Sequence, residues 1–437
     1  MNSKRRIRVI TLGCSKNDVD TEHLLSCLPD SDFEFSREDG SEAVDVLLIN
    51  TCGFIGDAKQ ESIGCILANV ERKQRGLIGK IAVFGCLSQR YAAELPALIP
   101  EVDAWFGARK LNPVLRYLGV SGDADSSTAR RMLPSPYAYL KISEGCNRRC
   151  SYCAIPSIRG RHRSVPVETL VEEATGLAAG GVKELLLIAQ DSTWYGLDLY
   201  GKRELGRLLD ALSEVEGIER LRIHYSHPDG FPVDVLERMA TNPKVCRYLD
   251  IPLQHISDKV LRAMHRHVSG NWTRELVQRL RREVPGVALR TTMIVGHPGE
   301  GEAEFEELLD FLREARFERL GAFAYSEEEG TWGASHLPDS IAPEEKQRRL
   351  DALMSLQRSI SREINEARIG TTARVLVDGY SDGLLVCRSE FESPEVDGEI
   401  LVGTEGLAAD PATLIGSFLD VRITGADEYD LSGQILA

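Results

Sequence analysis

Three closely spaced cysteines, Cys146, Cys150 and Cys153, constrain this chain more than any other feature. Their C-x3-C-x2-C spacing lets three thiolates bind three irons of a cubane [4Fe–4S] cluster and leaves the fourth iron without a protein ligand. An open metal position is where a substrate or cofactor binds. The expected occupant for this spacing is the amino and carboxylate end of S-adenosylmethionine, which an electron from the cluster splits to give a carbon radical. The triplet therefore predicts radical chemistry.

A structural zinc site is the alternative for the same three cysteines. Such sites are closed and four-coordinate, so they need a further Cys or His at a suitable spacing. The nearest candidate is His162, in a basic stretch of the chain. The open spacing favours the cluster over the zinc site.

The 437 residues suffice for two to four domains. No apolar run approaches the roughly 20 residues that span a bilayer, and the apolar run after the basic start, Ile7–Leu12, is too short for a secretion signal. We expect a cytoplasmic protein with no membrane contact. In that compartment its ten cysteines indicate metal or redox use rather than disulfides.

Residues 1–120 are predicted to form an open α/β domain with a parallel sheet. Three apolar, β-branched runs alternate with helical stretches, as in βαβ units. These runs are Ile7–Leu12, Val44–Ile49 and Ile81–Phe84.

A cysteine follows each of these three runs almost at once. The residues are Cys14, Cys52 and Cys86. Parallel strands place their carboxyl ends on one edge of a sheet, where open α/β folds bind ligands. Three thiols far apart in sequence can thus meet as a second three-thiolate site. The alternative is that they are unrelated thiols in turns, since free Cys packs as a small hydrophobe.

Residues 133–368 are predicted to form a partial (β/α)6 barrel with a long charged helix trailing it. Six strand-like runs alternate with helices, which is two short of a complete barrel. The runs are Ala138–Ser143, Glu184–Ala189, Leu221–Ser226, Arg247–Pro252, Leu289–Val295 and Gly321–Tyr325. The cysteine triplet, Gln190 and Gly296 all follow such runs, so they are expected at the mouth of the barrel.

Residues 369–437 are predicted to form a small antiparallel β-barrel, because short strands alternate with Asp-Gly turns. This segment has 13 acidic residues against three arginines and no lysine, a net charge of −10 out of −15 for the chain. Binding phosphates needs the opposite sign. Direct RNA binding by the barrel is therefore not expected, and a basic protein partner suits it better.

With these features in this order, the whole chain resembles the methylthiotransferases of the radical S-adenosylmethionine superfamily. Within them it is most similar to the branch that modifies a ribosomal protein. Four stretches carry the match: Gly13–Asp20, Cys153–Gly160, Gln190–Gly196 and Arg388–Gly398. The tRNA-modifying branch typically has Gln-Met-Asn after the first cysteine and Val-Pro-Tyr-Thr-Arg-Gly after the third cysteine of the triplet. This chain has neither.

The resemblance implies an α/β multidomain enzyme with a radical-SAM barrel and a TRAM-like terminal barrel. It implies two [4Fe–4S] clusters, one on Cys146, Cys150 and Cys153 and an auxiliary one, carrying the sulfur, on the three cysteines that follow the N-terminal strands. It places Tyr152, which lies between Cys150 and Cys153, at the adenine of S-adenosylmethionine. Gln190 stands where the superfamily binds the methionyl amine, and we expect Gly296 to line the adenosine.

The implied reaction adds a methylthio group to the β-carbon of an aspartate in the twelfth small-subunit ribosomal protein, taken free or on the subunit. One S-adenosylmethionine methylates the sulfur, and a second provides the radical that removes hydrogen from an unactivated carbon. A low-potential donor such as flavodoxin or ferredoxin would supply the electrons.

Two alternatives remain at the level of the sequence. One is a tRNA (adenosine) methylthiotransferase of the same family, which a basic terminal barrel would have favoured. The other is a non-catalytic two-cluster protein, an electron carrier or Fe–S scaffold. Electron carriers more typically use four cysteines per cluster, whereas each group here has three.

Overall fold

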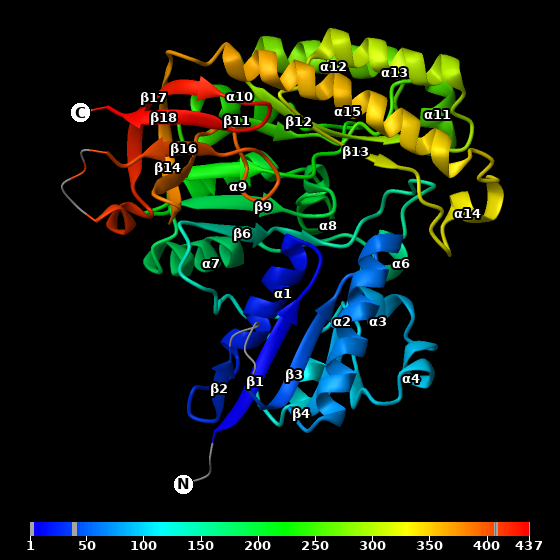
Figure 1. Cartoon of the computed structure of the whole chain (residues 1–437), viewed down its shortest axis with the longest axis vertical. Helices are drawn as coiled ribbons and strands as arrows, with labels where there is room; N and C mark the ends of the chain where they lie inside the picture. The colour runs from blue at the N-terminus through cyan, green and yellow to red at the C-terminus, as the bar shows by residue number, and fades with distance from the viewer. Residues whose placement is uncertain (1–3, 37–41, 406, 408–409, 437) are drawn as a thin grey trace.

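The computed structural model describes residues 4–36, 42–405, 407 and 410–436, and it confirms the predicted fold class (Figure 1). An N-terminal parallel sheet lies below a central six-stranded sheet in this view, and a closed barrel lies at the left of the central part. None of the described helices is both long and apolar enough to cross a membrane.

The N-terminal sheet has five parallel strands in the order β2-β1-β3-β4-β5. The strands are β1 (Arg5–Thr11), β2 (Phe33–Ser36), β3 (Val44–Thr51), β4 (Ile78–Gly85) and β5 (Ala104–Trp105). The helices are α1 (Ser15–Ser26), α2 (Gly56–Gln74), α3 (Cys86–Arg90), α4 (Leu95–Leu98) and α5 (Asn112–Tyr117). Two apolar clusters cover the two faces of the sheet, one including α1 and α5 and the other α2. The three predicted strands are its central ones.

The central sheet has six parallel strands in the order β13-β12-β11-β10-β9-β6. They are β6 (Tyr137–Lys141), β9 (Glu184–Ile188), β10 (Arg220–Ile223), β11 (Val245–Asp250), β12 (Ala288–Val295) and β13 (Arg319–Ala324). The main covering helices are α7 (Val167–Ala179), α9 (Leu205–Ser213), α10 (Asp234–Thr241), α12 (Gly270–Glu283), α13 (Glu302–Ala315) and the long α15 (Pro343–Glu366). Each of the six predicted runs overlaps a strand.

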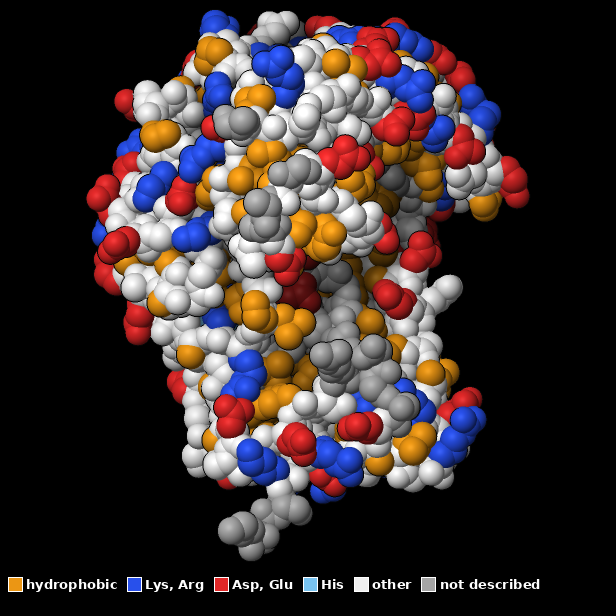
Figure 2. All heavy atoms as spheres, turned by 60° about the vertical axis from the view of Figure 1, so that its left-hand side comes forward, with side chains coloured by type: hydrophobic (Ala, Val, Ile, Leu, Met, Phe, Trp, Pro, Cys, Tyr) orange, Lys and Arg blue, Asp and Glu red, His pale blue; other side chains and the backbone are white. Residues whose placement is uncertain are grey.

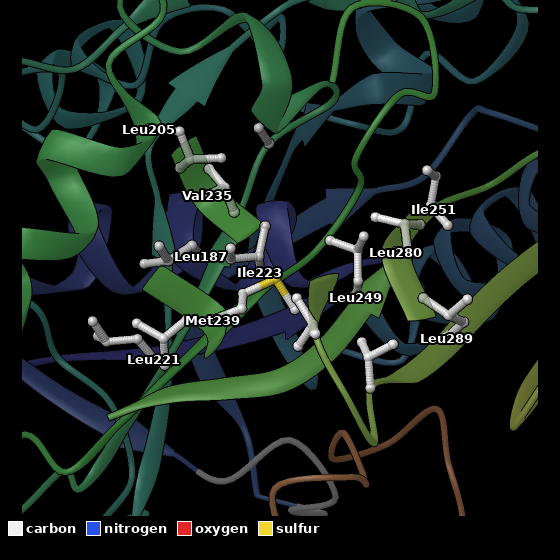
Figure 3. Packing of buried hydrophobic residues seen from close by; sticks show 14 of the residues in the cluster. Leu187, Leu205, Leu221, Ile223, Val235, Met239, Leu249, Ile251, Leu280 and Leu289 are labelled. Carbon is white, nitrogen blue, oxygen red and sulfur yellow. The ribbon is translucent and has the colours of Figure 1, made fainter. Parts of the chain in front are cut away.

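Side chains alternate between the two faces of this sheet. Leu187, Leu221, Ile223 and Leu249 pack with helix residues in one core, as Figure 3 shows. The intervening side chains of β10, such as Arg222, are equally buried but charged. The outer face of the sheet therefore packs with the helices in a hydrophobic core, and the inner face carries buried charged side chains.

The terminal barrel closes in the order β14-β15-β16-β18-β17. Its strands are β14 (Thr372–Ser381), β15 (Leu384–Arg388), β16 (Ile400–Gly403), β17 (Phe418–Ala426) and β18 (Leu431–Ile435). The described pairs are antiparallel except β16–β18, which is parallel. The four short strands that the sequence predicts, Ala373–Val377, Leu384–Arg388, Glu399–Val402 and Phe418–Thr424, overlap β14, β15, β16 and β17, and β18 was not predicted.

The segment Arg388–Asp397 of the terminal barrel lies across the starts of the central strands and contacts all six. Contacts at 3.4 Å or less are Tyr137 and Tyr139 of β6 to Glu395, Glu184 of β9 to Arg388, Arg222 of β10 to the carbonyl of Glu390, Tyr248 of β11 to Asp397, Arg290 of β12 to Asp397 and Arg319 of β13 to Glu392. We call this segment the plug.

Glu184 is the most buried carboxylate at this junction, with Arg222 at 2.7 Å and Arg388 at 3.1 Å. Burial alone would raise the pKa of Glu184, but the two guanidinium groups lower it to about 2. Replacing it leaves both arginines buried without this partner. Glu184→Gln should therefore lower the free energy of unfolding by about 3–5 kcal/mol in urea unfolding. The matched control is Glu219→Gln, which breaks an exposed pair with Arg374 and should cost less than about 1 kcal/mol. Equal losses for the two variants would contradict the assignment.

Candidate active site between two cysteine groups

Three N-terminal strands deliver one cysteine each to the same edge of the sheet. Cys14 precedes α1, Cys52 follows β3 and Cys86 begins α3. A Cβ on Gly13 would stand 2.6 Å from the Cβ of Cys52, and Gly13 has a φ of +102° that favours glycine. The first two cysteine loops are therefore in close contact. We call these three cysteines the auxiliary triad.

Two buried asparagines hold the loops of the auxiliary triad together. The side-chain amide of Asn17 donates to the carbonyls of Leu12 at 2.7 Å and Thr51 at 3.2 Å, just before Cys14 and Cys52. The amide of Asn50 donates to the carbonyl of Asn17 at 2.9 Å. The loops of Cys14 and Cys52 are thus fixed by hydrogen bonds from side-chain amides to backbone carbonyls.

The thiols of the auxiliary triad influence one another electrostatically. Burial raises the pKa of Cys86 to about 12, with Arg159 opposing and Cys14 and Cys52 adding to the rise. Burial also raises the pKa of Cys52, with Cys14 contributing. Neutral thiols at neutral pH must release protons when they bind metal.

The triplet, Cys146, Cys150 and Cys153, lies at the mouth end of β6, in a loop bracketed by the antiparallel pair β7 (Ser143–Glu144) and β8 (Arg163–Ser164). Neighbouring segments fix this loop. The N–H of Ser151 donates to the carbonyl of Met264 at 3.0 Å, and the N–H of Gly333 donates to the carbonyl of Ser151 at 2.7 Å. Backbone hydrogen bonds from segments distant in sequence thus hold the loop that carries the three thiols.

The thiols of the triplet also share one environment. Burial raises the pKa of Cys146 to about 12, and Cys150 adds to the rise. Burial raises the pKa of Cys153, with Cys150 next in effect. Tyr152 lies among them, and burial together with the Cys150 charge raises its pKa. His162, the fourth-ligand candidate, instead has Nε2 3.1 Å from the hydroxyl of Ser164.

Each group has the three thiols that a cubane cluster with one open iron needs. All six cysteines have free thiols. No group of three His, Cys, Asp or Glu side chains in the described ranges is arranged to hold a metal ion. A cubane cluster does not need such convergence, because each thiolate binds a different iron.

Several buried polar atoms near the triplet lack a hydrogen-bond partner among the described residues. They are Ser151 Oγ, Gln190 Oε1, His297 Nε2 and Tyr325 Oη. The rings of Tyr152 and His297 lie 6.4 Å apart, and those of His297 and Tyr325 4.9 Å apart. Buried polar atoms are normally satisfied, so this group suits a polar ligand.

Two of the predicted cofactor residues have clear local roles. Gln190 donates from Nε2 to Glu144 at 2.7 Å, which leaves its acceptor oxygen available. Gly296 donates its N–H to both oxygens of Glu300 at 3.0 Å. A Cβ at Gly296 would stand 2.4 Å from Lys346, so that this glycine permits close packing of α15. Their roles in cofactor binding stay predictions.

A buried charge network joins the two cysteine groups, and the sequence analysis did not identify it. Arg159, at the end of α6 (Ile155–Arg159), pairs with Asp20 of α1 at 2.7 Å and with Glu144 at 3.2 Å. Lys141 pairs with the same two carboxylates. Burial would raise the pKa of Glu144, but Lys141 and Arg159 lower it to about 2. Figure 1 shows α1 and α6 at the boundary between the N-terminal and central parts.

Three family models match successive parts of the chain. They are an uncharacterized protein family, UPF0004, over residues 6–107, the radical SAM superfamily over residues 140–312 and the TRAM domain over residues 369–436. A protein of Cytophaga hutchinsonii described as ribosomal protein uS12 methylthiotransferase RimO is 49% identical over 100% of this chain and 99% of its own length. The chain belongs to the RimO family.

Other RimO relatives are similar to this chain over nearly its full length. One from Porphyromonas gingivalis is 49% identical and covers 99% of both chains. One from Bacteroides fragilis is 46% identical, covering 99% of this chain and all of its own. As a member of the RimO family the chain is a radical S-adenosylmethionine methylthiotransferase, an enzyme class that uses [4Fe–4S] clusters and S-adenosylmethionine.

Solved structures support the fold alone. The radical S-adenosylmethionine methyltransferase TsrM of Kitasatospora setae, with cobalamin and a [4Fe–4S] cluster bound, has a TM-score of 0.59 at 14% identity and covers 94% of this chain and 85% of its own. The cobalamin-dependent enzyme OxsB has a TM-score of 0.51 at 13% identity and covers 82% of this chain and 56% of its own. This RimO-family chain therefore shares a barrel architecture with distant radical enzymes.

Proposed function

We propose that this enzyme adds a methylthio group to the β-carbon of one aspartate in ribosomal protein uS12. The similarity to RimO relatives over the full chain carries the proposal. The nonacidic C–H bond at that carbon resists acid–base catalysis, so a radical route is required. We infer a cytoplasmic site of action, where this substrate is made and assembled.

We propose that the triplet holds the cluster that binds S-adenosylmethionine and that the auxiliary triad holds the second cluster. When bound, the first supplies the electron that cleaves S-adenosylmethionine to a radical, and the second carries the sulfur to be inserted. The chain's own residues would hold the two clusters close together, because the triplet loop and the three strand ends meet across one boundary. The segments 1–120, 133–368 and 369–437 would serve as the auxiliary-cluster, radical and TRAM-like domains.

We assign the polar atoms beside the triplet to S-adenosylmethionine. The free oxygen of Gln190 can accept from the methionyl ammonium, and the half-buried Tyr152 lies in the loop where the adenine is expected. Gly296 would line the adenosine next to His297, whose Nε2 is free to bond. An external low-potential carrier such as flavodoxin or ferredoxin would deliver the electrons.

Substrate docking is proposed at the hollow between the N-terminal part and the rest of the chain. Figure 2 shows hydrophobic side chains gathered there. Glu395 of the plug is exposed and accepts hydrogen bonds from Tyr139 at 2.8 Å and Tyr137 at 3.2 Å. Because the plug lies at the strand starts and the triplet at the other end of β6, this acidic group would hold a basic surface of the ribosomal protein away from the reacting aspartate.

The test is a competition assay. The protein is reconstituted anaerobically with iron and sulfide and given reductant and S-adenosylmethionine. A uS12 peptide with its aspartate loop and a tRNA anticodon stem are offered together, and both are read by mass spectrometry. We expect the methylthio mass on the peptide alone and none on a peptide with that Asp replaced by Ala. The mass on the tRNA would contradict the proposal.

A further inference from the structure

Arg159 is a buried arginine that touches both cysteine groups. Its side chain is 2% exposed, although its neighbours Arg161 and Arg163 are exposed. A buried guanidinium needs partners for its five donors, so its contacts describe its role.

The partners of Arg159 come from both sides of the domain boundary. On the N-terminal side, Nε donates to the thiol sulfur of Cys86 at 3.2 Å, Nη1 to Asp20 at 2.7 Å and Nη2 to the side-chain oxygen of Asn17. On the central side, Nη1 donates to Glu144 at 3.2 Å, two residues before the triplet. One side chain therefore contacts an auxiliary cysteine, the asparagine that fixes its loop and the approach to the triplet.

The path from Arg159 back to the triplet is short and rigid. Helix α6 begins at Ile155, two residues after Cys153, and ends at Arg159. Ile158 and Ala154 of this segment pack with Cys86 in one buried cluster. A shift of the triplet loop would therefore move the group that bonds Cys86.

We propose that Arg159 is a positioning residue that bonds the Cys86 thiolate and fixes the auxiliary triad against the triplet. The inference rests on the proposed assignment of the auxiliary triad to a cluster. A hydrogen bond and a positive charge at a cluster thiolate stabilise the more reduced state and raise the reduction potential. Removing Arg159 should therefore shift the auxiliary potential to more negative values and loosen both sides of the boundary.

The first measurement uses the full chain with the triplet replaced by Ala, so that bound cluster iron belongs to the auxiliary triad. Its midpoint potential is followed by electron paramagnetic resonance. We expect Arg159→Met to shift it to more negative values and Arg159→Lys, which keeps the charge, to shift it less. Loss of iron from Arg159→Met but not from Arg159→Lys would support the same role.

Arg109→Met is the matched control. Arg109 is exposed and crosses the same boundary, but it donates to the carbonyls of Ser157 and Ile158 instead of a thiol. We expect no change of potential in this variant. An unchanged potential in Arg159→Met would overturn the inference. Failure of the parent with intact Arg159 to bind iron would overturn the auxiliary assignment, and this inference with it.

The second measurement needs no iron. Hydrogen–deuterium exchange is compared in the apo chain with all native cysteines. Arg159→Met should speed exchange of amides in both 14–20 and 155–160, because it removes bonds to both sides. Arg109→Met should affect 155–160 alone. Unchanged exchange at 14–20 in Arg159→Met would overturn the positioning role.

Discussion

Replacing Cys150 with Ala should abolish formation of 5′-deoxyadenosine and leave about half of the bound iron, because the auxiliary triad keeps its own ligands. Among the described residues, the thiol charges that act on Cys146 and Cys153 come from the triplet itself. Its other neighbours are Tyr152 and Arg266, whose Nη1 lies 3.9 Å from the Cys150 sulfur, and neither replaces a thiolate ligand. Chromatography of the nucleoside product and an iron assay give the two readings.

The control for this variant is Cys27→Ala. Cys27 is half-buried, and its sulfur lies near the hydroxyl of Ser26 rather than another thiol. We expect iron content and product formation to match the parent. A Cys150→Ala protein that still cleaves S-adenosylmethionine would show that the triplet is not the radical site.

Replacing Cys86 with Ala should have the opposite selectivity. S-adenosylmethionine cleavage should persist, because the triplet loop is held by the hydrogen bonds of Ser151 to Met264 and Gly333. Methylthio transfer should fall to background, because under the proposed assignment the cluster that carries the sulfur loses a ligand. Mass spectrometry of the uS12 peptide together with the nucleoside assay separates the two steps.

Two outcomes would contradict the assignment of radical formation to the triplet and of sulfur donation to the auxiliary triad. One is a methylthiolated peptide from Cys86→Ala at the parental level. The other is loss of 5′-deoxyadenosine together with the transfer, which would mean that the triplet depends on Cys86. Comparison with Cys150→Ala, in which both products should disappear, makes the distinction quantitative.

The sequence predicted the architecture because buried strands carry a strong local signal. The strands it missed lack that signal. β2 and β5 are edge strands of four and two residues. β18 reads Leu-Ser-Gly-Gln-Ile, with a glycine at its centre, and pairs with both β17 and β16. Short edges and glycine-containing strands owe their conformation to tertiary pairing, which a single sequence does not display.

The cysteine groups could be predicted, but the network between them could not. Parallel topology alone brings the auxiliary cysteines to one edge. The meeting of Asp20, Lys141 and Arg159 depends on how two domains are placed, which no spacing records. Asp20 and Arg159 lie inside stretches that carry the family resemblance, so their side chains were visible but their partners were not.

The terminal segment is acidic, but part of its negative charge is paired with arginines of the same chain. Five of its 13 acidic residues pair with arginines of this chain. The pairs are Asp378–Arg388, Glu390–Arg247, Glu392–Arg319, Asp397–Arg290 and Glu428–Arg362. Eight others are exposed and can face a basic partner. Composition gives the net charge, but it does not show which carboxylates are paired within the chain and which are exposed.

The plug has a consequence for exchanging parts between the branches of this family. The terminal barrel is not a detachable module, because its removal would take one hydrogen-bond or ion-pair partner each from Arg222, Arg290 and Arg319 at the starts of the central strands. A hybrid that grafts a tRNA-branch barrel onto this chain must carry matching strand-start residues with it. An exchange of the terminal barrel would therefore also change the contacts that hold the starts of the central strands.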